Sequence, residues 1–336
     1  MATLYLDDTL LMPAALSVPG LCFRGFRGSS DYAAMVAVIE GSKEADGIER
    51  VSSLADVART YEHLVNSDPY ADMIFAEVDG QVVGYSRVWW EELLDGARLY
   101  GHFVFLLPAF RGQGIEDAIL AGNESRLRQI AAAHPTGSKQ FNCWVSQSET
   151  NWRALLESVG YQPVRYGFSM VRPDLENIPD LPLPAGLELR PAHPDNYRTI
   201  WEAAREAFRD HWGMVEWSEE QYAEWRELPT FMPHLWQVAW AGDEVAGMVL
   251  NFIDEAENAE YGRRRGYTET IGVRRPWRRL GLARALLARS FQVLKDQDMT
   301  EAALGVDAEN ISGALRLYQS MGFQVVKQHI TYRKPL

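Results

Sequence analysis

The stretch GVRRPWRRLGLARALL, residues 272–287, places four arginines directly before a predicted helix: Arg274, Arg275, Arg278 and Arg279. A helix N-terminus carries partial positive charge, so each nearby cation costs about 0.3–1 kcal/mol unless something offsets it. Small residues at Gly281 and Ala283 let the backbone approach a ligand closely. Its N–H groups and the helix dipole would then face a phosphate or pyrophosphate, with the arginines as counterions. The alternative is an ordinary strand-to-helix turn with solvated arginines.

The two halves of the chain repeat one pattern. GYQPVRYGFSMVRP (160–173) aligns without a gap with GFQVVKQHITYRKP (322–335). IFAEVDGQVVGYSRV and QVAWAGDEVAGMVLN each place two apolar runs around an acidic turn, which is typical of a β-hairpin. Each hairpin precedes a turn into a helix. The sequence of 336 residues therefore predicts an α/β fold of two tandem domains, each a central mixed β-sheet flanked by helices.

The expected domain boundaries follow this repeat. We expect one domain over residues 1–173 and a second over 187–336. Between them, the prolines of DLENIPDLPLPAG (174–186) mark a stiff linker. In the second domain, YTETIGV (267–273) and EAALGVD (301–307) have the pattern of strands.

Composition and charge exclude several classes of function. The formal net charge is −13 and the pI is near 5.1, so we expect no nucleic-acid partner. No stretch approaches the roughly 20 apolar residues that cross a bilayer, and the first twenty residues lack a basic n-region. Two cysteines give no disulfide framework. The scattered histidines form no metal-ligand spacing. We therefore expect a cytoplasmic protein with no membrane partner and no metal.

A second cluster, VDAENISGALRLYQSMGF (306–323), completes the pattern of the C-terminal half. It contains the end of a strand, Asn310, a helix that carries Tyr318, and Gly322-Phe323 before another strand. Together with the turn near Gly281, this order resembles the GCN5-related N-acetyltransferase (GNAT) family. The resemblance covers residues 187 to 336 and recurs more weakly in the first half. P-loop and Rossmann motifs are missing from the sequence.

The resemblance implies acetyl-CoA as cosubstrate, held between two splayed parallel strands, 267–273 and 301–307. The residues that it implies for cofactor binding are Ile271, Gly272, Val273, Arg278, Arg279, Leu280, Gly281, Leu282, Ala283, Arg284 and Asn310. Asn310 has a second, compatible interpretation as the N-cap of the following helix.

Acetyl transfer to an amine needs a base for the ammonium and an acid for the departing thiolate. Tyr318 resembles the general acid of the family; its alternative is a core tyrosine. For the base we consider Glu269, because strand alternation places Tyr267, Glu269, Ile271 and Val273 on one face. Family members often carry a glutamate two positions earlier, where this chain has Tyr267. A solvated or structural carboxylate is the alternative role for Glu269.

The acceptor is expected to be a small-molecule amine. Asp210, His211 and Trp212 belong to FRDHWGMVEWSEEQYAEW (208–225), the segment that usually forms the acceptor wall in the family. Three aromatic residues nearby, Trp217, Tyr222 and Trp225, line a pocket or belong to the core.

The first half departs from the pattern at three positions: it has Glu116 where the second half has Ala283, Leu156 in place of Tyr318, and Ser148 in place of Asn310. We therefore predict a degenerate, catalytically silent first domain. The arrangement of a degenerate first domain before an intact second one resembles the mycothiol synthase group of the family. Tyr267, which replaces the expected glutamate, argues against assigning the substrate of that group to this chain.

The leading function is thus N-acetyl transfer from acetyl-CoA to a primary amine in the C-terminal domain. The alternatives are a non-catalytic acyl-CoA-binding regulator and mycothiol-synthase-like acetylation of a thiol–sugar conjugate.

Overall fold

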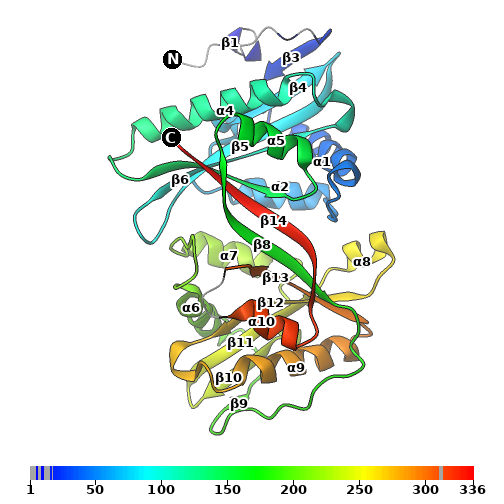
Figure 1. Cartoon of the computed structure of the whole chain (residues 1–336), viewed down its shortest axis with the longest axis vertical. Helices are drawn as coiled ribbons and strands as arrows, with labels where there is room; N and C mark the ends of the chain where they lie inside the picture. Colours follow the sequence, from blue (N-terminus) through cyan, green and yellow to red (C-terminus); the bar gives the residue numbers. More distant parts are fainter. Residues whose placement is uncertain (1–4, 7–8, 11–15, 17, 310–312) are drawn as a thin grey trace. The chain divides into compact units, whose positions relative to one another are not determined.

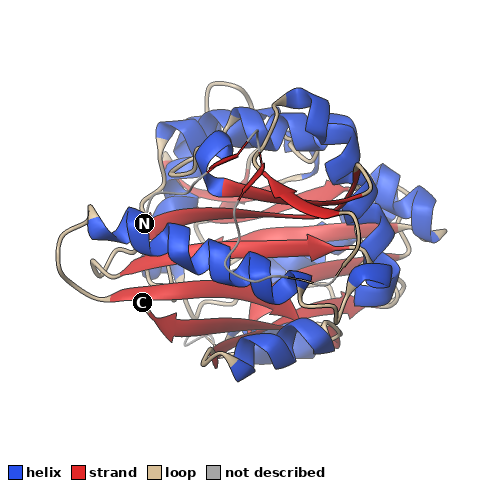
Figure 2. Cartoon of the chain, turned by 90° about the horizontal axis from the view of Figure 1, so that it is seen from above, coloured by secondary structure: helices blue, strands red, loops and turns tan. Residues whose placement is uncertain are grey.

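The computed structural model of the chain describes residues 5–6, 9–10, 16, 18–309 and 313–336 (Figure 1). The chain divides into two compact units: unit 1 comprises Met1–Arg165 and His329–Leu336, and unit 2 comprises Tyr166–Gln328. Each unit is an α/β fold in which helices lie on both faces of a mixed β-sheet (Figure 2). The boundaries of the compact units therefore differ from those of the sequence repeat, because the last segment of the chain, His329–Leu336, belongs to unit 1.

Unit 1 has a meander of antiparallel strands and one parallel pair, β6 with β7. Its strands are β1 (Tyr5–Leu6), β2 (Thr9–Leu10), β3 (Leu21–Arg24), β4 (Met73–Val78), β5 (Gln81–Glu92), β6 (Arg98–Leu106), β7 (Lys139–Ser146) and the end of β14 (Gln324–Pro335), which pairs with β7. Its α-helices are α1 (Tyr32–Asp46), α2 (Leu54–Glu62), α3 (Pro69–Asp72), α4 (Ile115–Ala132) and α5 (Thr150–Ser158); η1 (Ser29–Asp31) and η2 (Pro108–Phe110) are 3₁₀ turns.

Unit 2 repeats this order. Its strands are β8 (Gln162–Arg172), of which Gly167–Arg172 pair with β13, then β9 (Glu188–Leu189), β10 (Gln237–Ala241), β11 (Glu244–Ile253), β12 (Arg265–Val273) and β13 (Glu301–Asp307). Its helical elements are α6 (Tyr197–Phe208), α7 (Glu219–Glu227), η3 (Pro233–Leu235), α8 (Glu255–Tyr261), η4 (Arg275–Trp277), α9 (Leu282–Asp296) and α10 (Ala314–Ser320). The tandem α/β architecture expected from the sequence is thus confirmed.

Two helices cover opposite faces of the unit 2 sheet. On one face of the sheet, Leu287 and Phe291 of α9 are completely buried. On the other face, Ile200 of α6 packs with Met248 of β11. A Cβ on Gly266 would lie only 2.4 Å from the side chain of Leu294, so glycine allows α9 to pack closely on β12. Burial on both faces fixes the position of the strands that line the site.

The parallel strands β12 and β13 part before they end. Their register runs from Arg265 opposite Glu301 to Tyr267 opposite Ala303 and goes no further in the described pairing, although β12 continues to Val273 and β13 to Asp307. Backbone groups beyond this point have no sheet partner from the neighbouring strand. The splayed pair expected from the family resemblance is therefore present.

A β-bulge interrupts β12 next to this gap. Met248 of β11 faces Gly272 and Leu250 faces Glu269, so β12 has one extra residue there. Thr270 has a φ of 48°, which is unusual for a β-branched residue. The bulge reverses the alternation: Ile271 packs on the α9 side, whereas Glu269 precedes the reversal and belongs to the other face. The prediction that Tyr267, Glu269, Ile271 and Val273 share one face is therefore wrong beyond Glu269.

Candidate active site

A cavity of about 660 Å³ lies in unit 2 where β12 and β13 part. Its walls come from the ends of both strands, the turn before α9, and α10. Glu269 and Tyr318 both line it, as do nine of the predicted cofactor-binding residues: Ile271, Gly272, Val273, Arg278, Arg279, Gly281, Leu282, Ala283 and Arg284. Leu280 is not among the lining residues and is 57% exposed. Asn310 lies outside the described residues.

The turn before α9 presents its backbone to the cavity. Gly281 is the N-cap of α9 with a φ of 87°, and Arg279 has a φ of 64°. The first N–H groups of a helix have no intrahelical partner, so this turn offers donors to an anion. A Cβ at Gly281 would meet no atom within 4 Å, so the requirement for glycine comes from the backbone angle.

Most of the arginines in this turn are neutralised by the protein itself. Arg275 and Arg278 both pair with Asp210, and Arg274 pairs with Glu206 at 2.8 Å. Three of the four cations, which the sequence interpretation had assigned to a bound anion, therefore contact carboxylates of the protein, and Arg275 and Arg278 share one of these carboxylates.

The Arg278 guanidinium also has a structural role. Its Nε donates to the carbonyl of Val273 at 3.0 Å and its other nitrogen donates to that of Ala207 at 3.2 Å. Arg279 and Arg284 are different, because both are exposed, line the cavity and have no ion-pair partner among the described residues. These two side chains are the cations available to a ligand.

Glu269 lies in the gap between the splayed strands. The N–H of Gly305 donates to its Oε1 at 3.2 Å. Burial raises the pKa of Glu269 to about 7, and the hydrogen bond from Gly305 opposes this only in part. A carboxyl group that titrates near neutrality is suited to accept a proton from an amine.

Tyr318 projects from α10 into the same cavity and is 6% exposed. Burial, followed by the charge of Glu269, raises the pKa of Tyr318 above its ordinary value. The phenol is therefore protonated at neutral pH and has a proton to donate. The N-cap of α10 is Gly313, with a φ of 77°, so the interpretation of Asn310 as this cap is wrong.

The predicted acceptor residues have different surroundings. His211 lines the cavity, and burial lowers its pKa, which keeps the ring neutral at pH 7. Asp210 also lines the cavity, but it is held by Arg275 and Arg278. Trp212 is 40% exposed and is not a lining residue.

Sequence reasoning missed several lining residues, among them Thr268, Thr270 and Asp307. The signal for Asp307 was its position at the end of the second splayed strand. Thr270 carried no such signal, because its place in the wall depends on the bulge.

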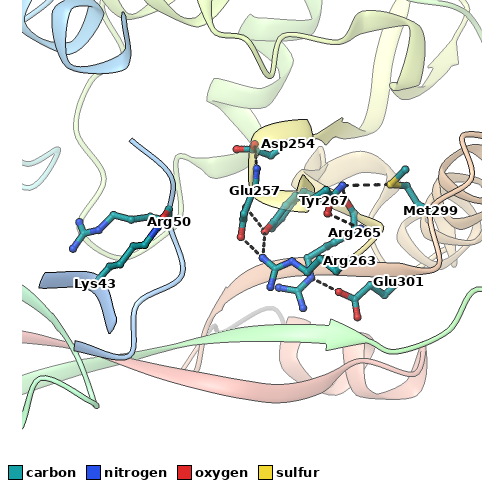
Figure 3. A network of polar contacts seen from close by, with 10 residues as sticks. Lys43, Arg50, Asp254, Glu257, Arg263, Arg265, Tyr267, Met299 and Glu301 are labelled. Carbon is teal, nitrogen blue, oxygen red and sulfur yellow. Dashed lines mark hydrogen bonds and ion pairs between the residues drawn. The ribbon is translucent and has the colours of Figure 1, made fainter. Parts of the chain in front are cut away.

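Tyr267, at the position where the family often has a glutamate, has a structural role. Its hydroxyl donates to Oε2 of Glu257 at 2.7 Å, and Glu257 also forms an ion pair with Arg263 (Figure 3). Its ring stacks on Phe252 with centroids 4.8 Å apart. Tyr267 is not among the lining residues of the cavity, and Glu269 is the glutamate of β12 that reaches it.

Unit 1 contains a smaller version of the same turn. Gly112 and Gly114 have φ values of 69° and 86°, close to those of Arg279 and Gly281. However, Glu116 accepts a hydrogen bond from the N–H of Gly112 at 3.4 Å, and the cavity there measures about 180 Å³. A carboxylate of the protein thus occupies the place where an anionic ligand would meet this turn.

The remaining contacts of the unit 1 turn repeat those of unit 2. The Nε of Arg111 donates to Leu106, five residues earlier, as that of Arg278 does to Val273. Arg111 also makes two hydrogen bonds with Asp46, the counterpart of the pairing with Asp210. The arginine before α4 or α9 therefore holds the turn against the C-terminal end of α1 or α6, respectively.

Two kinds of feature are missing from the part of the chain that the structure describes. No helix there has the length and apolar character needed to span a bilayer. The same residues contain no group of three or more His, Cys, Asp or Glu side chains placed to hold a metal ion.

Comparisons with known proteins agree with this geometry. Mycothiol acetyltransferase of Salinispora arenicola is 26% identical over 310 residues, which is 90% of this chain and 93% of that protein. The enzyme of the same name from Geodermatophilus obscurus is 24% identical over 312 residues, covering 90% and 94%.

Solved structures show the same architecture. A GCN5-related N-acetyltransferase from Sphaerobacter thermophilus superposes with a TM-score of 0.72 at 27% identity, covering 95% of this chain and 97% of its own. A tandem GNAT protein from the clavulanic acid biosynthesis pathway gives a TM-score of 0.66 at 15% identity, covering 94% and 98%. The acetyltransferase (GNAT) family profile matches residues 42–129 and 197–323, more than half of the chain. With its splayed strands and its Gly281 turn, this chain belongs to the GNAT family of acetyltransferases.

Proposed function

We propose that this protein transfers the acetyl group of acetyl-CoA to the primary amine of a small molecule, and that the reaction takes place in the C-terminal repeat. The observation that carries the proposal is one cavity lined by a carboxyl group with a pKa of about 7, a protonated phenol, and the backbone turn of a helix N-terminus. GNAT acetyltransferases use acetyl-CoA, and the turn near Gly281 supplies the donors and cations that a pyrophosphate needs.

Glu269 serves as the base in this proposal. An alkyl ammonium with a pKa near 10.4 is neutral in less than about one part in a thousand at pH 7, so removal of its proton limits attack. Glu269 accepts that proton, and the nitrogen lone pair then attacks the thioester carbonyl carbon. The carbon–sulfur bond breaks, and its electron pair leaves with the sulfur.

Tyr318 supplies the proton for the departing thiolate. The acylated nitrogen then loses its second proton to the phenolate of Tyr318, which leaves a neutral amide, a restored phenol and one proton on Glu269. The negative charge of Glu269 contributes to the raised pKa of Tyr318. When Glu269 takes the proton of the amine it becomes neutral, so that contribution disappears and the phenol becomes a better donor. The two proton transfers are thus ordered by one electrostatic interaction: the base acts first, and the acid acts when the thiolate forms.

The relatives named mycothiol acetyltransferase favour a second candidate acceptor, the amine of a thiol–sugar conjugate. The chemistry at Glu269 and Tyr318 is the same for both acceptors. Only the groups that hold the rest of the acceptor differ.

The test exchanges the residue types at Glu116 and Ala283, the corresponding positions of the two turns. Ala283→Glu introduces the carboxylate that unit 1 carries, and Glu116→Ala removes that carboxylate from unit 1. Calorimetry with acetyl-CoA and release of CoA thiol with a set of primary amines, including an amino sugar, are measured for both variants. We expect Ala283→Glu to weaken binding at least about 10-fold, since a like charge faces the pyrophosphate, while Glu116→Ala retains wild-type turnover.

Each outcome of this test separates the candidates. Unchanged binding in Ala283→Glu would place acetyl-CoA elsewhere and contradict the proposal. Tight binding without thiol release for any amine would favour the regulatory alternative. Release with the amino sugar alone would favour the second acceptor.

A further inference from the structure

A second cavity, of about 330 Å³, lies on the α6 side of unit 2. Three indole rings form much of its wall: Trp201 of α6, Trp217 of the following loop and Trp225 of α7. The ring centroid of Trp201 lies 4.5 Å from that of Trp217 and 5.0 Å from that of Trp225. None of the three rings has a cation over it among the described residues, whereas the neighbouring ring of Tyr222 is covered by Arg198 at 4.9 Å.

One carboxylate, that of Glu224, lines this aromatic cavity. The acidic residues around it are mostly neutralised: Glu219 by Arg198, Glu206 by Arg274, and Glu202 by Arg198 and Arg205. Glu224 is half-buried and has no hydrogen-bond or ion-pair partner in the described part of the chain. A partly buried charge beside apolar rings needs a counterion, and this cavity leaves space for one.

The aromatic cavity and the cavity that holds Glu269 share a wall residue. Thr270, at the bulge of β12, lines both of them. It follows Glu269 directly in the chain, and its positive φ places it out of the regular strand geometry. A molecule that extends past Thr270 would reach the base with one end and the indole rings with the other.

We propose that the aromatic cavity binds the distal part of the acceptor and selects a second cationic group, carried on an apolar or aromatic body beside the reacting amine. This inference rests on the proposed function. Indole faces attract cations, and the carboxylate of Glu224 supplies the opposite charge. Of the other lining residues, Ala204, Leu228 and Leu250 are apolar, and Gln221 is polar, with its side-chain oxygen accepting a hydrogen bond from the N–H of Ser218. A neutral polyol would need many hydrogen-bonding groups, and this wall offers few.

The experiment compares 1,5-diaminopentane with n-pentylamine, which has the same chain without the second charge. In the wild type we expect the KM of the diamine to be at least about 10-fold lower, corresponding to one additional cation contact. Glu224→Gln should abolish this preference, raising the KM of the diamine with kcat unchanged and leaving pentylamine unaffected. The matched control is Glu219→Gln, on the same helix but exposed and paired with Arg198, which should retain the preference.

Binding is measured separately with benzyltrimethylammonium, a cation that cannot be acetylated. Quenching of tryptophan fluorescence should saturate in the wild type and in Glu219→Gln, and should weaken at least about 10-fold in Glu224→Gln. The inference would be overturned by equal KM values for diamine and monoamine, or by quenching that is the same in Glu224→Gln as in the wild type. In either case, amine-dependent release of CoA thiol would still support the proposed function. Saturable quenching that depends on Glu224, without turnover of any amine, would support the cation site and contradict the proposed function.

Discussion

The N–H of Gly305 donates a hydrogen bond to the carboxylate of Glu269 across the gap between β13 and β12, with an N···O distance of 3.2 Å. Sheet pairing between these strands ends two residues earlier, at Tyr267 and Ala303. The carboxylate therefore stands where a backbone partner would otherwise be, and it is desolvated by the strands that part around it. This position accounts for its pKa of about 7.

The pH dependence of turnover should report Glu269. Its carboxylate form is the base, so kcat/KM of the wild type should rise as pH increases through about 7. Glu269→Gln keeps an oxygen acceptor for Gly305 but cannot take a proton, and we expect kcat/KM to fall by about 10²–10⁴-fold. Rates are measured from pH 5.5 to 9. Retention of the rise near pH 7 in the variant would assign it to a group other than Glu269.

Glu269→Gln, which should lower activity, should raise the stability of the protein above neutral pH. The native pKa of Glu269 lies above its usual value of 4.5, so between these values the native state binds more protons than the unfolded state and loses stability as pH rises. At pH 8 the wild type carries the full cost of the buried charge. Glu269→Gln should therefore be more stable at pH 8, by on the order of 1–3 kcal/mol, and the difference should shrink toward pH 5 in urea titrations. A difference independent of pH would contradict the assigned pKa.

Removal of the hydroxyl from Tyr318 and from Tyr267 should have contrasting effects. Tyr318→Phe keeps the ring packed on Phe323 and should lower kcat about 10²-fold with little change in thermal stability. Tyr267→Phe leaves Glu257 without its hydroxyl donor and should cost about 1.5–3 kcal/mol of stability with kcat retained. Thermal melts and steady-state rates test both. If Tyr267→Phe were the slower enzyme, the roles of the two phenols would have to be exchanged.

Arg279→Gly should separate affinity from stability. The residue adopts a φ of 64° that favours glycine, as in Gly112 at the corresponding position of unit 1. The substitution relieves this strain, so we expect a gain of about 0.5–1 kcal/mol in unfolding free energy. It also removes one of the two cations available at the cavity, so the KM for acetyl-CoA should rise and depend less on salt. Arg284→Gln is the control, because it removes a charge without relieving backbone strain.

Local patterns in the sequence were sufficient to predict the main elements of unit 2. The strand before Gly281, the helix after it and the hairpin of β10 with β11 all follow from apolar periodicity and turn residues within short windows. The degenerate turn of unit 1 was also visible, since Glu116 occupies the position of Ala283 in the aligned repeat.

Features that depend on contacts between distant residues could not be read from the sequence. The bulge at Thr270 adds one residue to a strand without a change in composition, and threonine normally avoids a positive φ. The neutralisation of Arg275 and Arg278 depends on Asp210, more than sixty residues away. The segments 160–173 and 322–335 resemble each other, so sequence alone does not decide which compact unit each one completes.

The hydrogen bond between Glu116 and Gly112 has a consequence for titrations of the intact chain. Two turns with nearly the same backbone angles would suggest that each polypeptide binds two equivalents of acetyl-CoA. The turn of unit 1, however, already holds the carboxylate of Glu116, which is part of the chain and cannot diffuse away. We expect a stoichiometry of one and a hyperbolic saturation curve with a Hill coefficient of one. On this expectation, the duplicated architecture would provide a single catalytic centre with no cooperativity between the repeats.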